Sequence, residues 1–233
     1  MWHTQCVGQV TAKGAVGTAV NDGQIRFRLA AASLNRDGYG KNTTDGSPVS
    51  DQNTMSGRVS LGWFPTGTNF SAQVSADHTN DDSHMRGFQR LAVSAFDPAK
   101  TPPGTSRYDI ASGMPNANGT KSEGESLTLN WGASADWSLK YILAHRASDT
   151  STAIDFDGLP NKIADVRAEY HDSSQSHEVQ AIYEGGASSG VLGLYYFDGR
   201  AGGTVRNNFF NASFGTTNGI VYTQGKAVFG DWS

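Results

Sequence analysis

The chain has 233 residues, of which 28 are glycine, 17% are charged and 37% are hydrophobic. Its net charge of −4 leaves no basic surface for a phosphate backbone, which argues against nucleic-acid binding. The single cysteine, Cys6, excludes an intramolecular disulfide, and no apolar run approaches the ~18 residues of a transmembrane helix. A closed sheet needs apolar residues only at alternate positions, so this composition leaves it open as a way across a membrane.

Apolar and polar residues alternate along the chain with the period of two that is typical of β-strands. Within residues 24–34, for example, Ile25, Phe27 and Leu29 share one face, and Arg26 and Arg28 occupy the other. The same pattern, strong in some segments and weaker in others, predicts about nine strands. These strands occupy residues 8–18, 24–34, 54–64, 70–77, 126–131, 137–144, 177–183, 191–198 and 220–229.

The links between the predicted strands alternate in length. The short links, rich in Gly, Asn, Asp and Ser, predict tight turns between antiparallel neighbours at residues 21–23, 65–68, 133–136 and 185–190. The long links are polar and cover residues 36–53, 78–123, 147–176 and 199–219. Links of this length are uncommon in compact soluble domains, whereas outer-membrane barrels combine short periplasmic turns with long extracellular loops.

Tryptophans lie beside the short links. Trp63 precedes the 65–68 turn, Trp131 and Trp137 flank the 133–136 turn, and Trp232 follows the last predicted strand. Amphipathic rings collect at the membrane–water interface, whereas a soluble sandwich core would favour positions in the middle of strands. The placement predicts an interfacial girdle on the turn side.

Several short motifs carry a resemblance to a known family. Residues 25–42 read IRFRLAAASLNRDGYGKN and residues 57–65 read GRVSLGWFP; DFDG (155–158), SHEVQA (176–181), GLYYFD (193–198) and AVFG (227–230) follow in order. In this order they resemble the barrel of TonB-dependent outer-membrane receptors. The resemblance implies an all-β fold, with residues 1–233 forming an antiparallel transmembrane barrel segment of about nine strands.

The resemblance also implies a function. Such a receptor lies in the outer membrane of a Gram-negative bacterium, binds a scarce ligand such as a ferric siderophore on its loops and plug domain, and imports it with energy transmitted by TonB. The family's 22-stranded barrel, plug, signal peptide and C-terminal aromatic strand are not found in these 233 residues. We therefore expect a fragment that neither transports a ligand nor inserts stably alone, because unpaired strand edges are costly in hydrocarbon.

Two other kinds of protein are compatible with this sequence pattern. A passive porin-like barrel would share the alternation and the girdle but lack a plug. A soluble, secreted carbohydrate-binding β-sandwich would pack its apolar faces against each other. No nucleophile elbow, phosphate-binding loop or dinucleotide motif is present, so we expect neither an enzyme nor a cofactor.

Two groups of residues in the sequence contain side chains that could bind a metal. DFDG at 155–158 resembles the start of a calcium loop, but Val166 stands where an EF-hand needs its glutamate, so a loop turn is the simpler interpretation. His78 and His84, near Asp81 and Asp82, form the nearest approach to a histidine cluster. We expect no metal at either place.

Other side chains are candidates for contacts with a plug or a ligand. Arg26, Arg28, Arg58 and Lys140 lie opposite the apolar face and would point into the lumen, toward plug carboxylates or lumenal water. The sequence does not identify the ligand. If this segment touches a ligand, the contacts are expected from the loop aromatics Tyr39, Phe88, Phe96, Tyr108 and Phe156.

Overall fold

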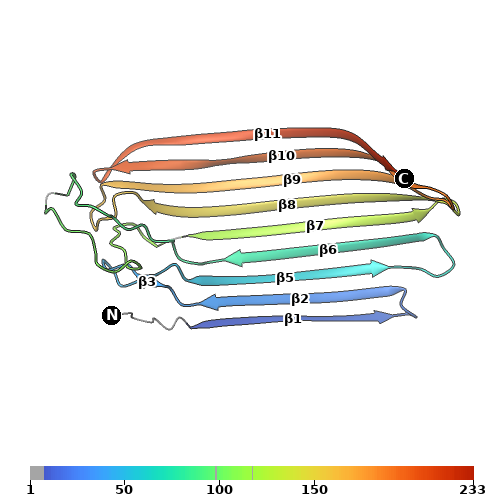
Figure 1. The fold of residues 1–233 in the computed structure, drawn as a ribbon, viewed down its shortest axis with the longest axis horizontal. Helices are drawn as coiled ribbons and strands as arrows, with labels where there is room; N and C mark the ends of the chain where they lie inside the picture. The colour runs from blue at the N-terminus through green and yellow to red at the C-terminus, as the bar shows by residue number, and fades with distance from the viewer. Residues whose placement is uncertain (1–7, 98, 117) are drawn as a thin grey trace.

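A computed structural model describes residues 8–97, 99–116 and 118–233. The expectations about Cys6 and about the first seven residues lie outside this range. Nine strands form one antiparallel sheet in chain order, as predicted (Figure 1). They are β1 (Gln9–Val20), β2 (Ile25–Arg36), β5 (Gln52–Trp63), β6 (Phe70–Asp81), β7 (Gly119–Gly132), β8 (Trp137–Asp155), β9 (Ala164–Glu184), β10 (Ser189–Phe209) and β11 (Ala212–Trp232).

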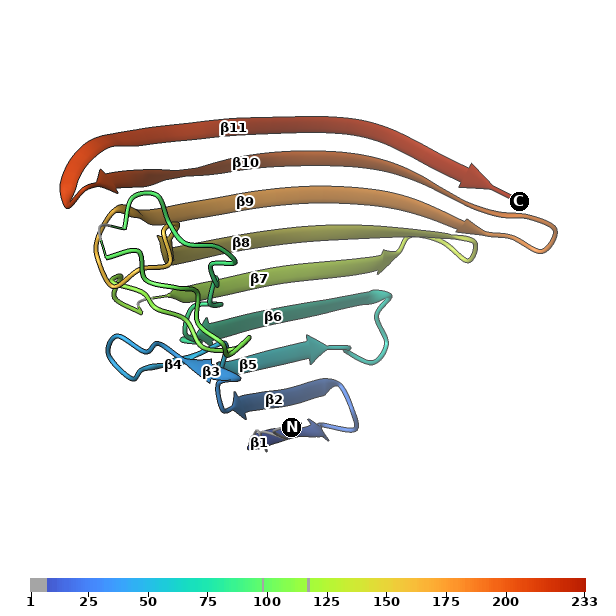
Figure 2. The same cartoon turned by 60° about the vertical axis from the view of Figure 1, so that its left-hand side comes forward.

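The sheet is a single layer. Figures 1 and 2 show the turns that follow β1, β5, β7 and β9 at one end of the sheet, and the remaining links, including the short β10–β11 turn, at the other. β1 and β11 are the two edges, and no pairing joins them within the described residues, so the sheet is open. None of the described residues forms a helix long and apolar enough to cross a membrane.

The strand register sorts the side chains into two faces, because directly paired residues point to the same side. One continuous row across all nine strands is entirely apolar: Val20, Ile25, Trp63, Ala72, Leu129, Tyr141, Val179, Leu194 and Val228. We call the face that carries this row the outer face. The opposite, inner face holds mainly small and polar residues, such as the paired Ser60, Ser75 and Ser126. Toward the C-terminal strands it also carries large apolar side chains, among them Ile142, Phe197 and Phe229.

The outer face is uncovered. Leu61 and Val74 are each 45% exposed at the middle of the sheet, and Leu194 is 58% exposed. A β-sandwich would bury such rows against a second sheet, but beside the large sheet the described residues form only a two-stranded ribbon, β3 (Gly40–Lys41) with β4 (Pro48–Val49). The sandwich reading therefore does not fit this architecture.

The predicted tryptophan girdle is present on the outer face at the turn end. The Trp63 ring packs edge-on against Phe70, with centroids 5.9 Å apart. Trp137, Tyr183 and Trp232 form a continuous aromatic row, with centroid separations of 5.0 and 5.2 Å. These side chains are partly exposed, as amphipathic rings at an interface would be.

Two of the predicted long links are wrong in extent. Most of residues 147–176 and 199–219 continues β8, β9, β10 and β11. What remains is an eight-residue link at 156–163 and a two-residue turn at Phe210–Asn211, where both residues have positive φ (52° and 61°). The extensions of β8, β10 and β11 are rich in Ser, Thr, Gly and Asn and show no regular apolar alternation. The start of β9 does alternate, with Ala164, Val166 and Ala168 on one face and charged residues on the other, and the sequence analysis missed this signal.

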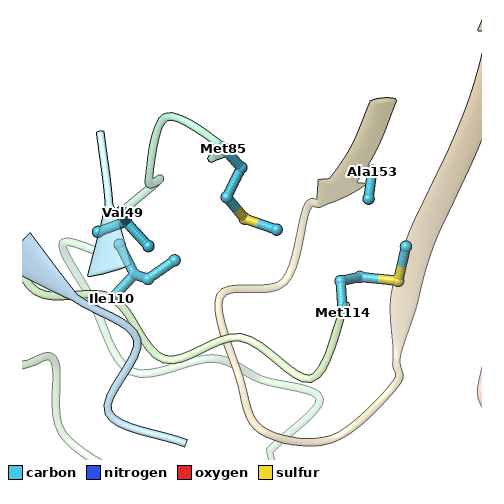
Figure 3. Close-up of a cluster of buried hydrophobic side chains, with 5 residues drawn as sticks. All are labelled: Val49, Met85, Ile110, Met114 and Ala153. Atoms are coloured by element: carbon cyan, nitrogen blue, oxygen red, sulfur yellow. The ribbon is translucent and has the colours of Figure 1, made fainter. Parts of the chain in front are cut away.

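The largest buried cluster lies in the loops, not in the sheet. The described residues 37–51, 82–97, 99–116, 118 and 156–163, which we call the loop cap, fold over one end of the sheet (Figure 2). Val49, Met85, Ile110 and Met114 are at most 6% exposed and pack beside Ala153 of β8 (Figure 3). The Asn42 side chain joins two of these loops through a pair of hydrogen bonds. Its Nδ2 donates to the Ser112 carbonyl and its Oδ1 accepts from the Ser112 N–H, each at 3.0 Å. The cap is therefore an ordered part of the fold.

Candidate functional site

The cationic side chains predicted to face the lumen share the inner face. Arg26 pairs with Gly62, Arg28 with Ser60, Arg58 with Ala30 and Asp77, and Lys140 with Asn130 and Gln180. All four therefore project from the face opposite the exposed apolar rows. The structure confirms that these four side chains lie on the face opposite the apolar one, as the alternation predicts. That they contact plug carboxylates or lumenal water stays a prediction.

A charged network crosses the middle of this inner face. Arg146 on β8 reaches over β7 to bind Asp77 on β6, with Nη2 and Oδ2 3.1 Å apart. Gly124 lies between them, and a Cβ there would approach the Arg146 guanidinium to 2.9 Å. Arg58, next to Asp77, donates to the Ser75 hydroxyl at 3.1 Å. The network holds charged side chains in place on a wall that faces water.

A polar pocket opens where the inner face meets the loop cap. Its volume is about 630 Å³, and Arg36, Tyr39, His84, Arg86 and Thr150 are among the lining residues. We call it the mouth pocket. It is lined by residues from two loops of the cap and from the cap end of the sheet, so its shape depends on how these loops dock.

Hydrogen bonds fix two of the lining side chains. The Arg36 guanidinium donates to the Ser50 carbonyl at 2.9 Å and stacks on the Tyr39 ring, 4.1 Å from its centroid. His84 Nδ1 lies 2.8 Å from Asp51 Oδ2. Arg86 is exposed, and no ion pair within the described part of the chain includes it. The pocket thus offers one uncommitted cationic group beside an ordered aromatic ring.

The loop aromatics lie on the cap as expected, but the structure brings together only some of them. Tyr39 and Tyr108 are neighbours, with ring centroids 6.5 Å apart. The Phe96 ring packs edge-on against the Phe210 ring, with ring centroids 6.1 Å apart. The sequence analysis assigned Phe210 to a long loop and did not identify it as a partner. Phe88 and Phe156 are more than 60% exposed. Exposed rings of this kind can stack on or enclose a ligand.

His78 and His84, the nearest approach to a histidine cluster in the sequence, have different surroundings in the structure. His84 pairs with Asp51, and the Asp81 carboxylate binds the backbone N–H and hydroxyl of Ser83. His78 lies within β6, on the outer face. The described residues therefore provide no shared site for His78 and His84.

Three carboxylates meet at the tip of the β8–β9 hairpin. Asp155 ends β8, Asp157 lies in the link, and Asp165 follows the start of β9 and pairs directly with Asp155. One carboxylate oxygen from each residue lies within 4.8 Å of the others. Sequence reasoning considered Asp155 and Asp157 but missed Asp165, because the strand pairing that brings it in cannot be read from residue spacing.

The three carboxyl groups differ in their surroundings. Burial, together with the carboxylates of Asp155 and Asp157, raises the pKa of Asp165 to about 6. Burial also raises the pKa of Asp157, against backbone hydrogen bonds that oppose the shift. Buried carboxyl groups that repel one another in this way favour a bound proton or a bound cation.

The comparisons with known proteins support the fold. No protein-family model matches the chain, and no curated protein matches its sequence. Among solved structures, the ferric yersiniabactin uptake receptor FyuA from Yersinia pestis matches 97% of this chain with a TM-score of 0.78 and 16% sequence identity. The chain spans 35% of that receptor's length. At this identity the likeness shows the fold alone: an open, nine-stranded antiparallel sheet like a segment of that receptor.

Proposed function

We propose that the chain is a segment of the barrel wall of a TonB-dependent receptor in the outer membrane of a Gram-negative bacterium. The parent protein would import a scarce ligand such as a ferric siderophore. Its partners would be the lipid bilayer, its own plug domain and TonB. Residues 1–233 supply nine strands of the wall and part of the extracellular loops.

The observation that carries this proposal is the two-faced sheet. Its outer face exposes a continuous apolar row and an aromatic girdle, and its inner face holds polar and charged residues. This distribution suits acyl chains on one side and water on the other. The likeness to a siderophore uptake receptor supports the same reading at the level of fold.

The mouth pocket is the proposed place of ligand contact in this segment. It combines the Tyr39 ring with the uncommitted guanidinium of Arg86. An aromatic ring beside a cation suits an anionic ligand with planar groups. The exposed rings of Phe88, Phe96, Tyr108 and Phe156 would extend the contact surface outward.

Uptake measured in cells tests the proposal. Deleting the gene is expected to abolish uptake of at least one iron-loaded siderophore from a panel labelled with radioactive iron, and a plasmid copy should restore it. A protonophore should block the restored uptake, because energy reaches TonB from the inner-membrane proton gradient. Solute passage that continues in the presence of the protonophore would show a passive porin and contradict the proposal.

A charge-neutral variant tests the pocket. Arg86→Gln is expected to weaken binding of the transported ligand about tenfold, the cost of losing a hydrogen bond to a charged group. Arg107→Gln removes the same charge from an exposed position that does not line the pocket, and should bind as the wild type does. Equal affinities for the two variants would place the ligand elsewhere.

A further inference from the structure

The aspartates at the tip of the β8–β9 hairpin are arranged in an unusual way. Asp155 and Asp165 are direct cross-strand partners, and like charges placed opposite each other destabilise a sheet. Asp157 adds a third carboxylate within 4.8 Å. No ion pair in the described part of the chain involves any of the three. Three carboxylates therefore converge here without an ion-pair partner among the described residues.

Backbone amides hold two of the carboxylates in place. Asp155 Oδ1 accepts from Asp157 and Gly158 at 3.1 and 2.7 Å, and its Oδ2 accepts from Gly113 at 3.2 Å. Asp157 accepts from the N–H groups of Leu159, Ile163 and Ala164 at 2.9, 3.1 and 2.6 Å. Carboxylates fixed by such bonds have settled orientations and still carry lone pairs for a further ligand.

Asp165 is the exception. The residue is 2% exposed, and its Oδ1 is fully buried and has no hydrogen-bond partner. A buried acceptor without a partner costs about 1–3 kcal/mol, and more when it is charged. The nearest cationic side chains, Lys162 and Arg167, are exposed and make no ion pair with it. An unpartnered oxygen of this kind, beside two ordered carboxylates, points to a ligand.

We propose that Asp155, Asp157 and Asp165 bind one Ca²⁺ ion. Ca²⁺ takes oxygen ligands at about 2.3–2.6 Å, so two of its ligand oxygens can be up to about 5 Å apart, which accommodates the observed set. Mg²⁺ requires near-ideal octahedral geometry and loses its water reluctantly, so it is seldom held by a set of protein carboxylates alone. Asn208 on β10 is the direct strand partner of Asp165, which puts its side chain on the same face of the sheet.

The ion would join separate parts of the loop cap. Gly113 of the 82–118 link donates to both Asp155 and the Leu159 carbonyl, and Arg90 of the same link donates to the Gly158 carbonyl at 3.1 Å. Neutralising the three carboxylates would favour this docked arrangement over an opened one. Ca²⁺ would thereby order the loops that form the proposed ligand surface, although binding itself does not depend on the proposed transport function.

Calcium titration of the protein, purified in detergent from cells expressing its gene and freed of metal with a chelator, tests the proposal. Isothermal titration is expected to show one saturable Ca²⁺ site. At free Ca²⁺ of ten times the dissociation constant, trypsin cleavage after Arg90 should slow about tenfold, because the ion binds only the closed cap. Mg²⁺ at the same concentration should produce neither effect.

Conservative variants make the test specific. Asp165→Asn keeps the shape of the side chain and removes its charge; it should bind Ca²⁺ at least about tenfold more weakly, and its cleavage should not respond to Ca²⁺. Asp172→Asn removes one charge from an exposed position of β9 and should behave as the wild type. If Asp165→Asn does not fold, Asp157→Asn takes its place.

Three results would overturn the proposal. One is the absence of saturable Ca²⁺ binding to the wild type below about 1 mM, the range of weak extracellular sites. Another is unchanged affinity in the Asp165→Asn variant, or in Asp157→Asn where it is used instead. The third is equal binding of Mg²⁺. None of these results depends on whether the protein transports a siderophore, so failure here and failure of the proposed function can be told apart.

Discussion

Val59→Arg is expected to destabilise the membrane-inserted protein by about 2–4 kcal/mol, the cost of an arginine on the lipid face near the bilayer midplane. Val59 lies near the centre of β5 on the outer face, paired with Leu29 on β2 and Ala76 on β6. Its two direct partners are apolar, and the nearest acidic residue of the same row, Glu125, lies one strand beyond Ala76 and pairs with His145. The guanidinium would therefore enter hydrocarbon without a directly opposed acidic partner.

The neighbouring position provides the control. Ser60→Arg places the same side chain one residue along the same strand, but on the inner face between Arg28 and Ser75. We expect a change of less than about 1 kcal/mol there, because the side chain remains in water. Guanidinium unfolding of the protein in lipid vesicles measures both values. Equal costs at the two positions, or a larger cost for Ser60→Arg, would contradict the assignment of the faces.

Residues 1–233 produced alone are expected not to form a stable transmembrane structure. Among the residues that the structure describes, β1 pairs only with β2 and β11 only with β10, so each edge presents a row of backbone groups without strand partners there. In hydrocarbon, each such group costs several kcal/mol. Summed over even a few groups, this cost exceeds the ~5–15 kcal/mol that separates most native proteins from the unfolded state.

Protease protection in vesicles measures this prediction. The isolated segment, added from urea to preformed vesicles, should be digested completely and should migrate identically in gels with and without heating. The gene product extracted from cells serves as the comparison and should resist digestion in its strands. A protected isolated segment whose migration changes on heating would show that the two edges close, within one copy or between copies, and would refute the prediction.

The sequence contained most of the information needed for the part of the sheet that we propose faces the membrane. Strands such as β2 and β5 are visible because lipid or an interface requires apolar residues on one face, and water requires polar ones on the other. The turn at residues 21–23 was predictable for a separate reason, since Asn21, Asp22 and Gly23 all adopt positive φ. Local chemistry and face preference agree there, so the assignment was correct.

The parts that were missed have different causes. The run Ser148 to Thr152 of β8 is polar on both faces, so pairing with neighbouring strands rather than burial defines it. The start of β9 does alternate, and its Val166 and Ala168 are buried, but it was assigned to a polar link. The Phe210–Asn211 turn places a phenylalanine at positive φ, which no residue preference predicts. Asp165 joins Asp155 only through strand pairing, which the linear spacing of a calcium loop does not describe.

The central claim is that the outer face meets lipid and the inner face meets water, and single cysteines along β6 test it most directly. With Cys6 replaced by Ser, cysteines are introduced one at a time at Gln73, Val74, Ser75 and Ala76, and outer membranes of expressing cells are treated with a charged, water-soluble maleimide or with a lipid-soluble one. The account predicts strict alternation: positions 73 and 75 react with the charged reagent, whereas positions 74 and 76 react only with the lipid-soluble one. Reaction of all four positions with the charged reagent, or protection of 74 and 76 from both reagents, would contradict it.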